Sequence, residues 1–352
     1  MYSNLKYASI KGIAAAVPTQ KITNEHLAKK FPGVDRTAKL AGVEYRRRAP
    51  DSVCTSDLCF IAGKQILEDL SWDSDSIDGL IFISQTSDYL LPATSYVLHK
   101  RLNLSKHAMV LDINLGCSGY IYGLFVINCL IQAGKLKRVL LLCGDTNSKI
   151  ISPEDMGSQV LFGDAGTATC IEYSETAEEN HFLLGADGSK YNALIMRNYG
   201  FRNETAPTIN NKGGVDNLNP QLHMDGSQVY SFALTEVPKM IKQLLDKSNT
   251  NLNSIDYFFF HQANQYMLNN IISKANIKIE KCPMNIKEFG NTNSASLPLL
   301  IVSENKKYNF DKKNIYTFMA GFGVGLSWGG ILINLNKIKI SDLIEYNHYT
   351  VL

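Results

Sequence analysis

The chain has 352 residues, of which 45% are hydrophobic, and a formal net charge of +2 at pH 7. This length corresponds to about two domains of typical size or to one large fused unit, and it is sufficient to bury a sizeable core. A charge so close to balance argues against a protein that binds nucleic acid or another polyanion through general positive charge.

The seven cysteines are scattered along the chain, and no two of them have the spacing of metal ligands. Several lie inside apolar runs, so we expect reduced thiols rather than disulfides. Residues 1–18 lack the long apolar segment of a signal peptide, and no apolar run is long enough to span a membrane. We therefore expect a cytoplasmic protein that does not enter a membrane.

The first half of the chain alternates predicted strands and helices. Strands are predicted over residues 7–16, 77–84, 108–113 and 138–145, and at the end of 157–171. Helices are predicted over residues 23–31, 55–70, 94–102 and 120–133. Apolar strands that alternate with helices are typical of a layered α/β fold.

The second half repeats this pattern after a polar, irregular stretch at residues 174–220, which we interpret as an excursion between two halves. Helices are predicted over 229–245, after 264 and from 297, and strands over 255–260, 284–286, 315–319 and 331–335. The pattern predicts two similar halves, 1–173 and 174–352, with a site at their junction. This is an inference from pattern alone, because no sequence identity between the halves is evident.

The stretch LDINLGCSGYIYGL, residues 111–124, contains the first candidate nucleophile. Cys117 follows an apolar strand and precedes an apolar helix, so it is expected at a helix N-terminus. Backbone N–H groups and the helix dipole favour an anion there, and we expect a lowered thiol pKa. The alternative is a buried structural cysteine, the usual fate of a free thiol.

His261 and Asn291 are two further candidates, because each lies at the end of an apolar segment, where functional groups gather in α/β folds. A hydrogen-bonded histidine at a strand end is the alternative for His261. Asn291 follows a glycine, and Gly-Asn is a good turn dipeptide. Taken singly, both residues favour the structural interpretation.

Several phrases together resemble the β-ketoacyl-acyl-carrier-protein synthase III family of the thiolase superfamily. They are the cysteine turn at 111–124, FGDAG at 162–166, HQAN at 261–264, GNTNSAS at 290–296 and GFGVGLSWGG at 321–330. Their order and spacing match the family over nearly the whole chain, which makes coincidence a poor explanation. The resemblance implies a thiolase-like, duplicated α/β fold: two similar halves with a layered α-β-α-β-α architecture.

The resemblance also implies a reaction. Cys117 would take an acyl primer as a thioester, and malonyl on an acyl carrier protein would lose CO₂ and attack it to give a 3-oxoacyl product. His261 and Asn291 would donate hydrogen bonds to the enolate oxygen. The loop Gly323, Val324, Gly325 and the N–H of Cys117 would meet the second oxyanion. No metal or redox cofactor is required.

Four positions bear on how the substrates bind. Arg36 and Met156 align with the Trp and Arg that clamp the adenine of coenzyme A in well-known members. The resemblance therefore leaves open an acyl-CoA primer that binds differently or a primer on a carrier protein. Tyr266 stands where an Arg of the carrier-protein docking patch is common, whereas Lys274 is retained.

Leu91, directly before Pro92, matches a residue that closes the partner's acyl pocket in this family. Its side chain is smaller than the usual aromatic one. The resemblance thus implies a homodimer, with residues near 85–95 crossing the interface, and room for primers longer than acetyl.

Two other functions remain open from the sequence. One is transfer of the acyl group from Cys117 to an oxygen or nitrogen nucleophile, and the other is a non-enzymatic scaffold that binds a carrier protein. The presence of His261 and Asn291 favours condensation, because plain acyl transfer forms no enolate.

Overall fold

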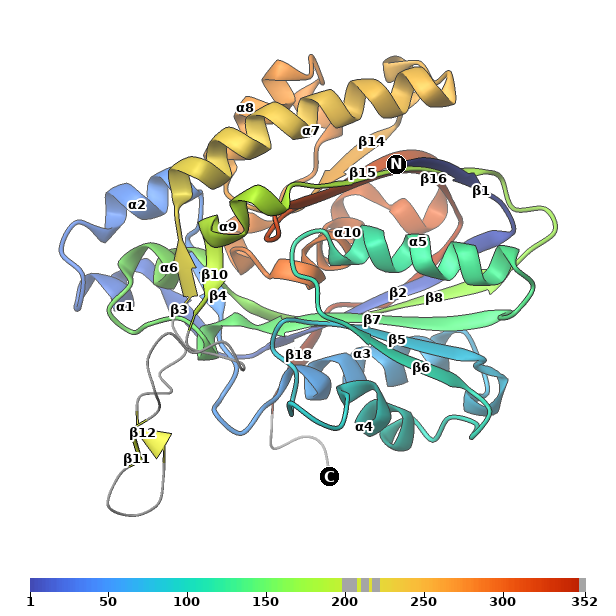
Figure 1. Ribbon diagram of the computed structural model, residues 1–352, viewed down its shortest axis with the longest axis horizontal. Helices are drawn as coiled ribbons and strands as arrows, with labels where there is room; N and C mark the ends of the chain where they lie inside the picture. Colours follow the sequence, from blue (N-terminus) through green and yellow to red (C-terminus); the bar gives the residue numbers. More distant parts are fainter. Residues whose placement is uncertain (198–207, 210–214, 217–221, 348–352) are drawn as a thin grey trace.

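Two β-sheets and three layers of helices alternate through the molecule in this computed structural model (Figure 1). It describes residues 1–197, 208–209, 215–216 and 222–347. The helices between the sheets are α5 (Gly119–Gln132) and α10 (Ser296–Tyr308). The outer layers are α7 (Gly226–Ser248) with α8 (Gln265–Lys274), and α3 (Thr55–Asp69) with α4 (Thr94–Arg101). The expected α-β-α-β-α architecture is confirmed.

The first sheet has the strand order β17-β2-β8-β7-β5-β6, with β18 also paired to β2. Its strands are β2 (Ala8–Pro18), β5 (Gly79–Ile83), β6 (Met109–Ile113), β7 (Arg138–Thr146), β8 (Asp164–Tyr173), β17 (Lys339–Ile340) and β18 (Ile344–Tyr346). Strand β5 pairs in parallel with both β6 and β7. The carboxyl ends of these three strands therefore share one edge of the sheet, which is where sites form in α/β folds.

The second sheet has the order β1-β9-β16-β15-β14. Its strands are β1 (Tyr2–Leu5), β9 (Asn180–Ala186), β14 (Tyr257–Phe260), β15 (Asn314–Gly323) and β16 (Ser327–Asn336). Strand β1 thus belongs to the sheet of the second half, whereas β17 and β18 belong to that of the first. Each half of the chain therefore contributes at least one strand to the sheet of the other half. The division into 1–173 and 174–352 stays a prediction.

Helix α5 shows why the central layer forms. Its sequence GYIYGLFVINCLIQ contains no charged residue, as expected for a helix enclosed on all sides. Ile121, Leu124 and Ile127 of α5 pack in one buried cluster with Leu300 and Ile301 of α10. Burial of each such side chain stabilises the fold by roughly 1.5–3 kcal/mol.

Smaller elements lie beside the two sheets, on the left of Figure 1. They are α1 (Asn24–Ala28), α2 (Val34–Ala41), α6 (Met156–Leu161), β3 (Lys21–Thr23), β4 (Tyr45–Arg47), β10 (Leu194–Met196) and β13 (Leu222–Met224). The short strands β11 (Thr208–Ile209) and β12 (Val215–Asp216) pair antiparallel as a separate two-stranded sheet. In the described part of the chain, no helix is both long and apolar enough to cross a membrane.

Two sequence expectations were wrong. Residues 174–220 are not irregular throughout, because β9 pairs with both β1 and β16 and buries Phe182. The apolar run of this strand, FLLG, is short and has polar neighbours, so the sequence did not indicate a strand. Residues 198–207, 210–214 and 217–220 of that stretch lie outside the described residues. Residues 284–286 form no strand: Ile286 begins the helix α9 (Ile286–Phe289). A three-residue apolar run is too short to define a period.

Candidate active site

Cys117 lies in the tight turn between β6 and α5, and the residue is 7% exposed. The thiol donates a hydrogen bond to Asn293 Oδ1 at 3.2 Å. Glycine at position 119 lets the start of α5 lie close against β5, because a Cβ there would lie 2.6 Å from Ile83 Cγ2. The sulfur is thus held at the carboxyl end of β6, on the edge shared by the parallel strands.

The connection between β15 and β16 covers the sulfur from the second half of the chain. A Cβ on Gly323 would lie 2.7 Å from Cys117 Sγ, so only glycine leaves room for the thiol there. Ser327 Oγ donates to Val324 O at 2.8 Å and lies 2.7 Å from Ser118 Oγ. These contacts fix the loop against the cysteine turn.

His261 directly follows β14 and is 1% exposed. Its Nδ1 lies 2.6 Å from Ser296 Oγ, and Phe322 packs edge-on against its ring, with the ring centroids 5.7 Å apart. Burial lowers the pKa of His261 to about 3, so the imidazole is neutral at pH 7. Phe322 precedes Gly323, so one strand end contacts both the histidine and the cysteine.

The segment 291–294 links Asn291 to the cysteine. The side-chain Oδ1 of Asn291 accepts a hydrogen bond from Asn293 N at 2.9 Å, and Asn293 in turn contacts the thiol. Asn293 has a φ of 54°, a left-handed conformation that asparagine tolerates better than most residues. Among the described residues, none accepts a hydrogen bond from Asn291 Nδ2.

Asp145 joins this segment to the end of β5. Its fully buried carboxylate accepts hydrogen bonds from Ser294 Oγ at 2.6 Å and from Gln85 N at 2.7 Å. Further bonds come from Ser84 Oγ at 3.2 Å and Thr86 Oγ1 at 3.3 Å. Burial raises the pKa of Asp145 to about 6, although these hydrogen bonds oppose the rise.

A cavity of about 230 Å³ opens beside Cys117. One group of its lining residues carries carboxamides: Gln85, Asn114, Asn147 and Asn293. Apolar residues form another group: Ile150, Phe162, Leu194, Ile195, Met196 and Leu222. Val324 completes the lining next to the sulfur.

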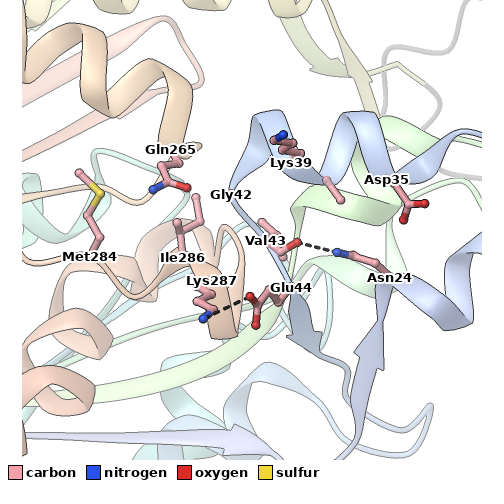
Figure 2. A pocket seen from close by; sticks show the side chains of 11 residues that line it. Asn24, Asp35, Lys39, Gly42, Val43, Glu44, Gln265, Met284, Ile286 and Lys287 are labelled. Atoms are coloured by element: carbon pink, nitrogen blue, oxygen red, sulfur yellow. Dashed lines mark hydrogen bonds and ion pairs between the residues drawn. The ribbon is translucent and has the colours of Figure 1, made fainter.

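A second cavity, of about 450 Å³, lies between α2 and the start of α8 (Figure 2). Gln265 packs beside Gly42, where a Cβ would lie 2.2 Å from its Oε1. Lys287 Nζ and Glu44 Oε1 form an ion pair at 3.2 Å across the lower rim in Figure 2. None of the candidate residues predicted from the sequence lines this cavity.

Four residues predicted for substrate binding lie away from the thiol. Arg36 is exposed on α2, and Met156, the first residue of α6, packs beside the small apolar cluster that includes Val34 and Val160. Leu91 is 78% exposed. Lys274 is exposed at the end of α8 and donates to Leu234 O at 2.9 Å. The chain therefore does not bring these four side chains into the cavity next to Cys117.

Comparison with known proteins decides the family. The family model of 3-oxoacyl-[acyl-carrier-protein] synthase III matches residues 111–188, and the model of its C-terminal part matches residues 245–335. A putative 3-oxoacyl-[acyl-carrier-protein] synthase 3 of Campylobacter jejuni is 33% identical over 356 residues, which covers 98% of this chain and 99% of the relative. The chain belongs to the 3-oxoacyl-ACP synthase III family.

Solved structures agree with this assignment to a family of condensing, acyl-transferring enzymes. A 3-oxoacyl-(acyl-carrier protein) synthase from Burkholderia xenovorans superimposes with a TM-score of 0.92 at 41% identity, covering 98% of this chain and 99% of that one. The synthase III of Pseudomonas aeruginosa gives a TM-score of 0.82 at 26% identity, covering 94% and 99% of the two chains. The resemblance inferred from the sequence phrases is confirmed.

Sequence reasoning missed several residues of this synthase-III site. Asn293 and Ser296 lie inside the phrase GNTNSAS, but only the structure shows that they contact Cys117 and His261. Gln85, Asn114 and Asn147 each follow a predicted apolar strand by one or two residues. The rule that was applied to His261, that functional groups gather at strand ends, would have found them.

The expected low pKa of Cys117 was wrong. Burial raises the pKa of the thiol to about 12, although hydrogen bonds from the backbone N–H groups of Val324 and Cys117 itself oppose the rise. The helix N-terminus favours a thiolate by less than desolvation disfavours it.

In the described part of the chain, no group of three His, Cys, Asp or Glu residues is arranged to hold a metal ion.

We expect slow alkylation of Cys117 by iodoacetamide at pH 7, because the reactive thiolate is scarce in the resting protein. The rate should continue to rise between pH 8 and 10. Peptide mass mapping identifies the modified cysteine, and Cys117→Ala is the control. A rate that is already maximal at pH 7 would contradict a buried, protonated thiol.

Asp145 should make stability depend on pH. Its pKa is about 6 in the folded protein and 3.8 as the ordinary value, so the folded state holds the proton more tightly. The stabilisation from this group is fully present below pH 4 and is lost as the pH rises through 6. The free energy of unfolding of the wild type minus that of Asp145→Asn should therefore fall between pH 4 and 7 in denaturant titrations.

Asp187→Asn is the control, because hydrogen bonds from Ser189 lower the pKa of this exposed carboxyl. Any pH-dependent difference for this variant should have the opposite sign. A difference for Asp145→Asn that grows with pH would contradict the raised pKa.

Proposed function

We propose that this protein condenses an acyl primer bound to Cys117 with malonyl on an acyl carrier protein, releasing CO₂ and a 3-oxoacyl carrier protein. The observation that carries the proposal is the buried thiol with backbone N–H groups of Val324 and Cys117 directed at it, linked through Asn293 to Asn291. A neutral histidine contacts the same strand end.

In the first step, the sulfur of Cys117 attacks the primer's thioester carbonyl. The C–S bond to the carrier breaks, the new acyl-enzyme thioester forms, and the thiol proton leaves with the carrier's sulfur. The N–H groups of Val324 and Cys117 donate to the oxygen that becomes negative in the tetrahedral intermediate.

In the second step, malonyl carrier protein loses CO₂, and its enolate attacks the acyl carbonyl on Cys117. The new C–C bond forms, the C–S bond to Cys117 breaks, and the released thiolate takes up a proton from solvent. His261 and Asn291 donate hydrogen bonds to the enolate oxygen. A neutral ring has one N–H, so we propose that the hydroxyl of Ser296 donates to Nδ1 and leaves the proton on Nε2. Asn291 has its oxygen engaged by Asn293 N, which leaves its Nδ2 as the donor.

The substrates follow from this reaction: an acyl thioester as primer and malonyl on an acyl carrier protein, with no further cofactor. Arg36 and Met156 supply no aromatic face for an adenine, which supports a primer delivered by a carrier protein. We propose that the carrier docks near Lys274. There, Tyr266 stacks on Tyr230 with the ring centroids 5.7 Å apart. Because Tyr266 stands where an arginine is common in the family, the docking surface has one cationic group fewer than is usual.

We further propose a cytoplasmic homodimer that pairs through β6, the last strand of the first sheet. Large exposed apolar side chains gather around this edge: Tyr89, Leu90, Leu91, Tyr96 and Leu111. Such a patch commonly marks an interface between proteins. Leu91 would then reach the partner's acyl cavity.

Acyl transfer to an oxygen or nitrogen nucleophile is not favoured, because it would leave the hydrogen-bond donors His261 and Asn291 without an enolate to stabilise. A non-enzymatic scaffold would not need the buried thiol and its directed N–H groups.

Intact-protein mass spectrometry after incubation with acyl thioesters, followed by malonyl carrier protein, tests the condensation. The wild type should gain an acyl adduct and lose it to malonyl carrier protein with release of CO₂, whereas Cys117→Ala should gain none. His261→Ala should still be acylated, but its decarboxylation rate should fall by ~10²–10³ because one oxyanion donor is lost. Discharge by an alcohol or amine but not by malonyl carrier protein would contradict the condensation.

Light scattering on a sizing column tests the dimer. The wild type should have twice the monomer mass, and Leu111→Arg, which places a charge on the pairing edge, should be a monomer. Ile279→Arg is a matched control, because Ile279 is 54% exposed but lies outside this edge. A monomeric wild type would contradict the proposed dimer interface.

A further inference from the structure

The cavity beside Cys117 is lined by three carboxamides that the proposed reaction does not use. Gln85 follows β5, Asn114 follows β6 and Asn147 follows β7. Because these strands are parallel neighbours in the order β7-β5-β6, their carboxyl ends place three carboxamides along one edge. Asn293 adds a fourth from the second half of the chain. The sheet itself therefore builds a row of amides next to the acyl-accepting sulfur.

The rest of the lining is apolar, with Phe162 and Met196 among its members, and no charged side chain lines the cavity among the described residues. A carboxylate or an ammonium group on the primer would find no counter-charge there, and burial of an unpaired charge is costly. The cavity is thus suited to a neutral group that is polar on one side and apolar on the other.

The hydrogen-bonding capacity of the amides is only partly used inside the protein. Asn293 accepts from the thiol and donates to Gln85 Oε1 at 3.3 Å, and Asn147 Nδ2 donates to Gly163 O at 3.2 Å. Among the described residues, no hydrogen bond is made by Gln85 Nε2, by Asn147 Oδ1 or by the Asn114 side chain. The cavity therefore offers both donors and acceptors to its occupant.

We propose that the primer is a short acyl group that carries a neutral hydrogen-bonding substituent, with a hydroxyl as the simplest case. This inference rests on the proposed function and names its substrate class. A plain alkyl chain would displace water from these amides and leave them unpaired, whereas a hydroxyl both donates and accepts. A site built to hydrogen-bond a hydroxyl rejects the analogue that lacks it.

The cavity is small. Its volume of about 230 Å³ lies below the roughly 300–1,000 Å³ that is typical of ligand pockets. We therefore expect it to take a short acyl group rather than a long fatty acyl chain.

The test compares pairs of primers of equal shape. Each hydroxyacyl thioester is paired with the thioester in which a methyl group replaces the hydroxyl, for example 3-hydroxybutyryl with 3-methylbutyryl. Pairs with the hydroxyl at carbon 2, 3 or 4 are offered on coenzyme A and on a carrier protein. The measured quantity is the rate of acylation of Cys117, followed by discharge with malonyl carrier protein.

The wild type should prefer the hydroxyl member of at least one pair by about tenfold or more. In Asn147→Leu, which keeps the side-chain size but removes the amide, this preference should fall by at least about tenfold or reverse, and the methyl member should load faster than in the wild type. Ile150→Val is the matched control in the same wall: it should change both rates alike and leave their ratio unchanged.

The outcomes separate the two proposals. Equal or faster loading of the methyl member in every pair, with normal discharge by malonyl carrier protein, overturns the hydroxylated primer and leaves the condensation intact. A tenfold preference that Asn147→Leu and Asn114→Leu both leave unchanged overturns the role of the amide wall. No acylation by any primer overturns the proposed function and this inference with it.

Discussion

The buried carboxylate of Asp145 is the constraint on which the rest of the site depends. It accepts hydrogen bonds from Gln85 at the end of β5 and from Ser294 in the segment that holds Asn291 and Asn293. These segments come from the two sequence halves. A carboxylate that is fully buried must be satisfied by hydrogen bonds, so both segments are held in one arrangement. The thiol of Cys117 is placed through Asn293 as a result.

The same burial sets the chemistry of the site. It keeps His261 neutral and Cys117 protonated, since charged forms lose their hydration in the interior. A neutral imidazole donates one hydrogen bond without acting as a general acid of pKa near 7. A protonated thiol is protected from unwanted reaction until a thioester arrives. Low dielectric also strengthens the hydrogen bonds to an oxyanion once it forms.

Much of the fold and the family was predictable from the sequence, because apolar strands and helices alternate with clear periods and the phrases around Cys117, His261 and Asn291 are specific. The pKa of Cys117 was not, because the burial of its sulfur depends on residues as distant in sequence as Gly323, which packs against it. Strand β9 was hidden by polar neighbours. The amides at 85, 114 and 147 become a group only when β7, β5 and β6 are placed side by side.

The exchange of strands between the sheets has a consequence for synthesis of the chain. Strand β1 completes the second sheet from the start of the chain, whereas β17 and β18 pair with β2 of the first sheet from its far end. During translation, β1 therefore has no pairing partner until β9 has been made. One edge of β2 stays unpaired until residue 346 has left the ribosome. An open edge can pair with other chains. The nascent protein is thus exposed to misassembly until its last strands emerge, and both halves mature together rather than one after the other.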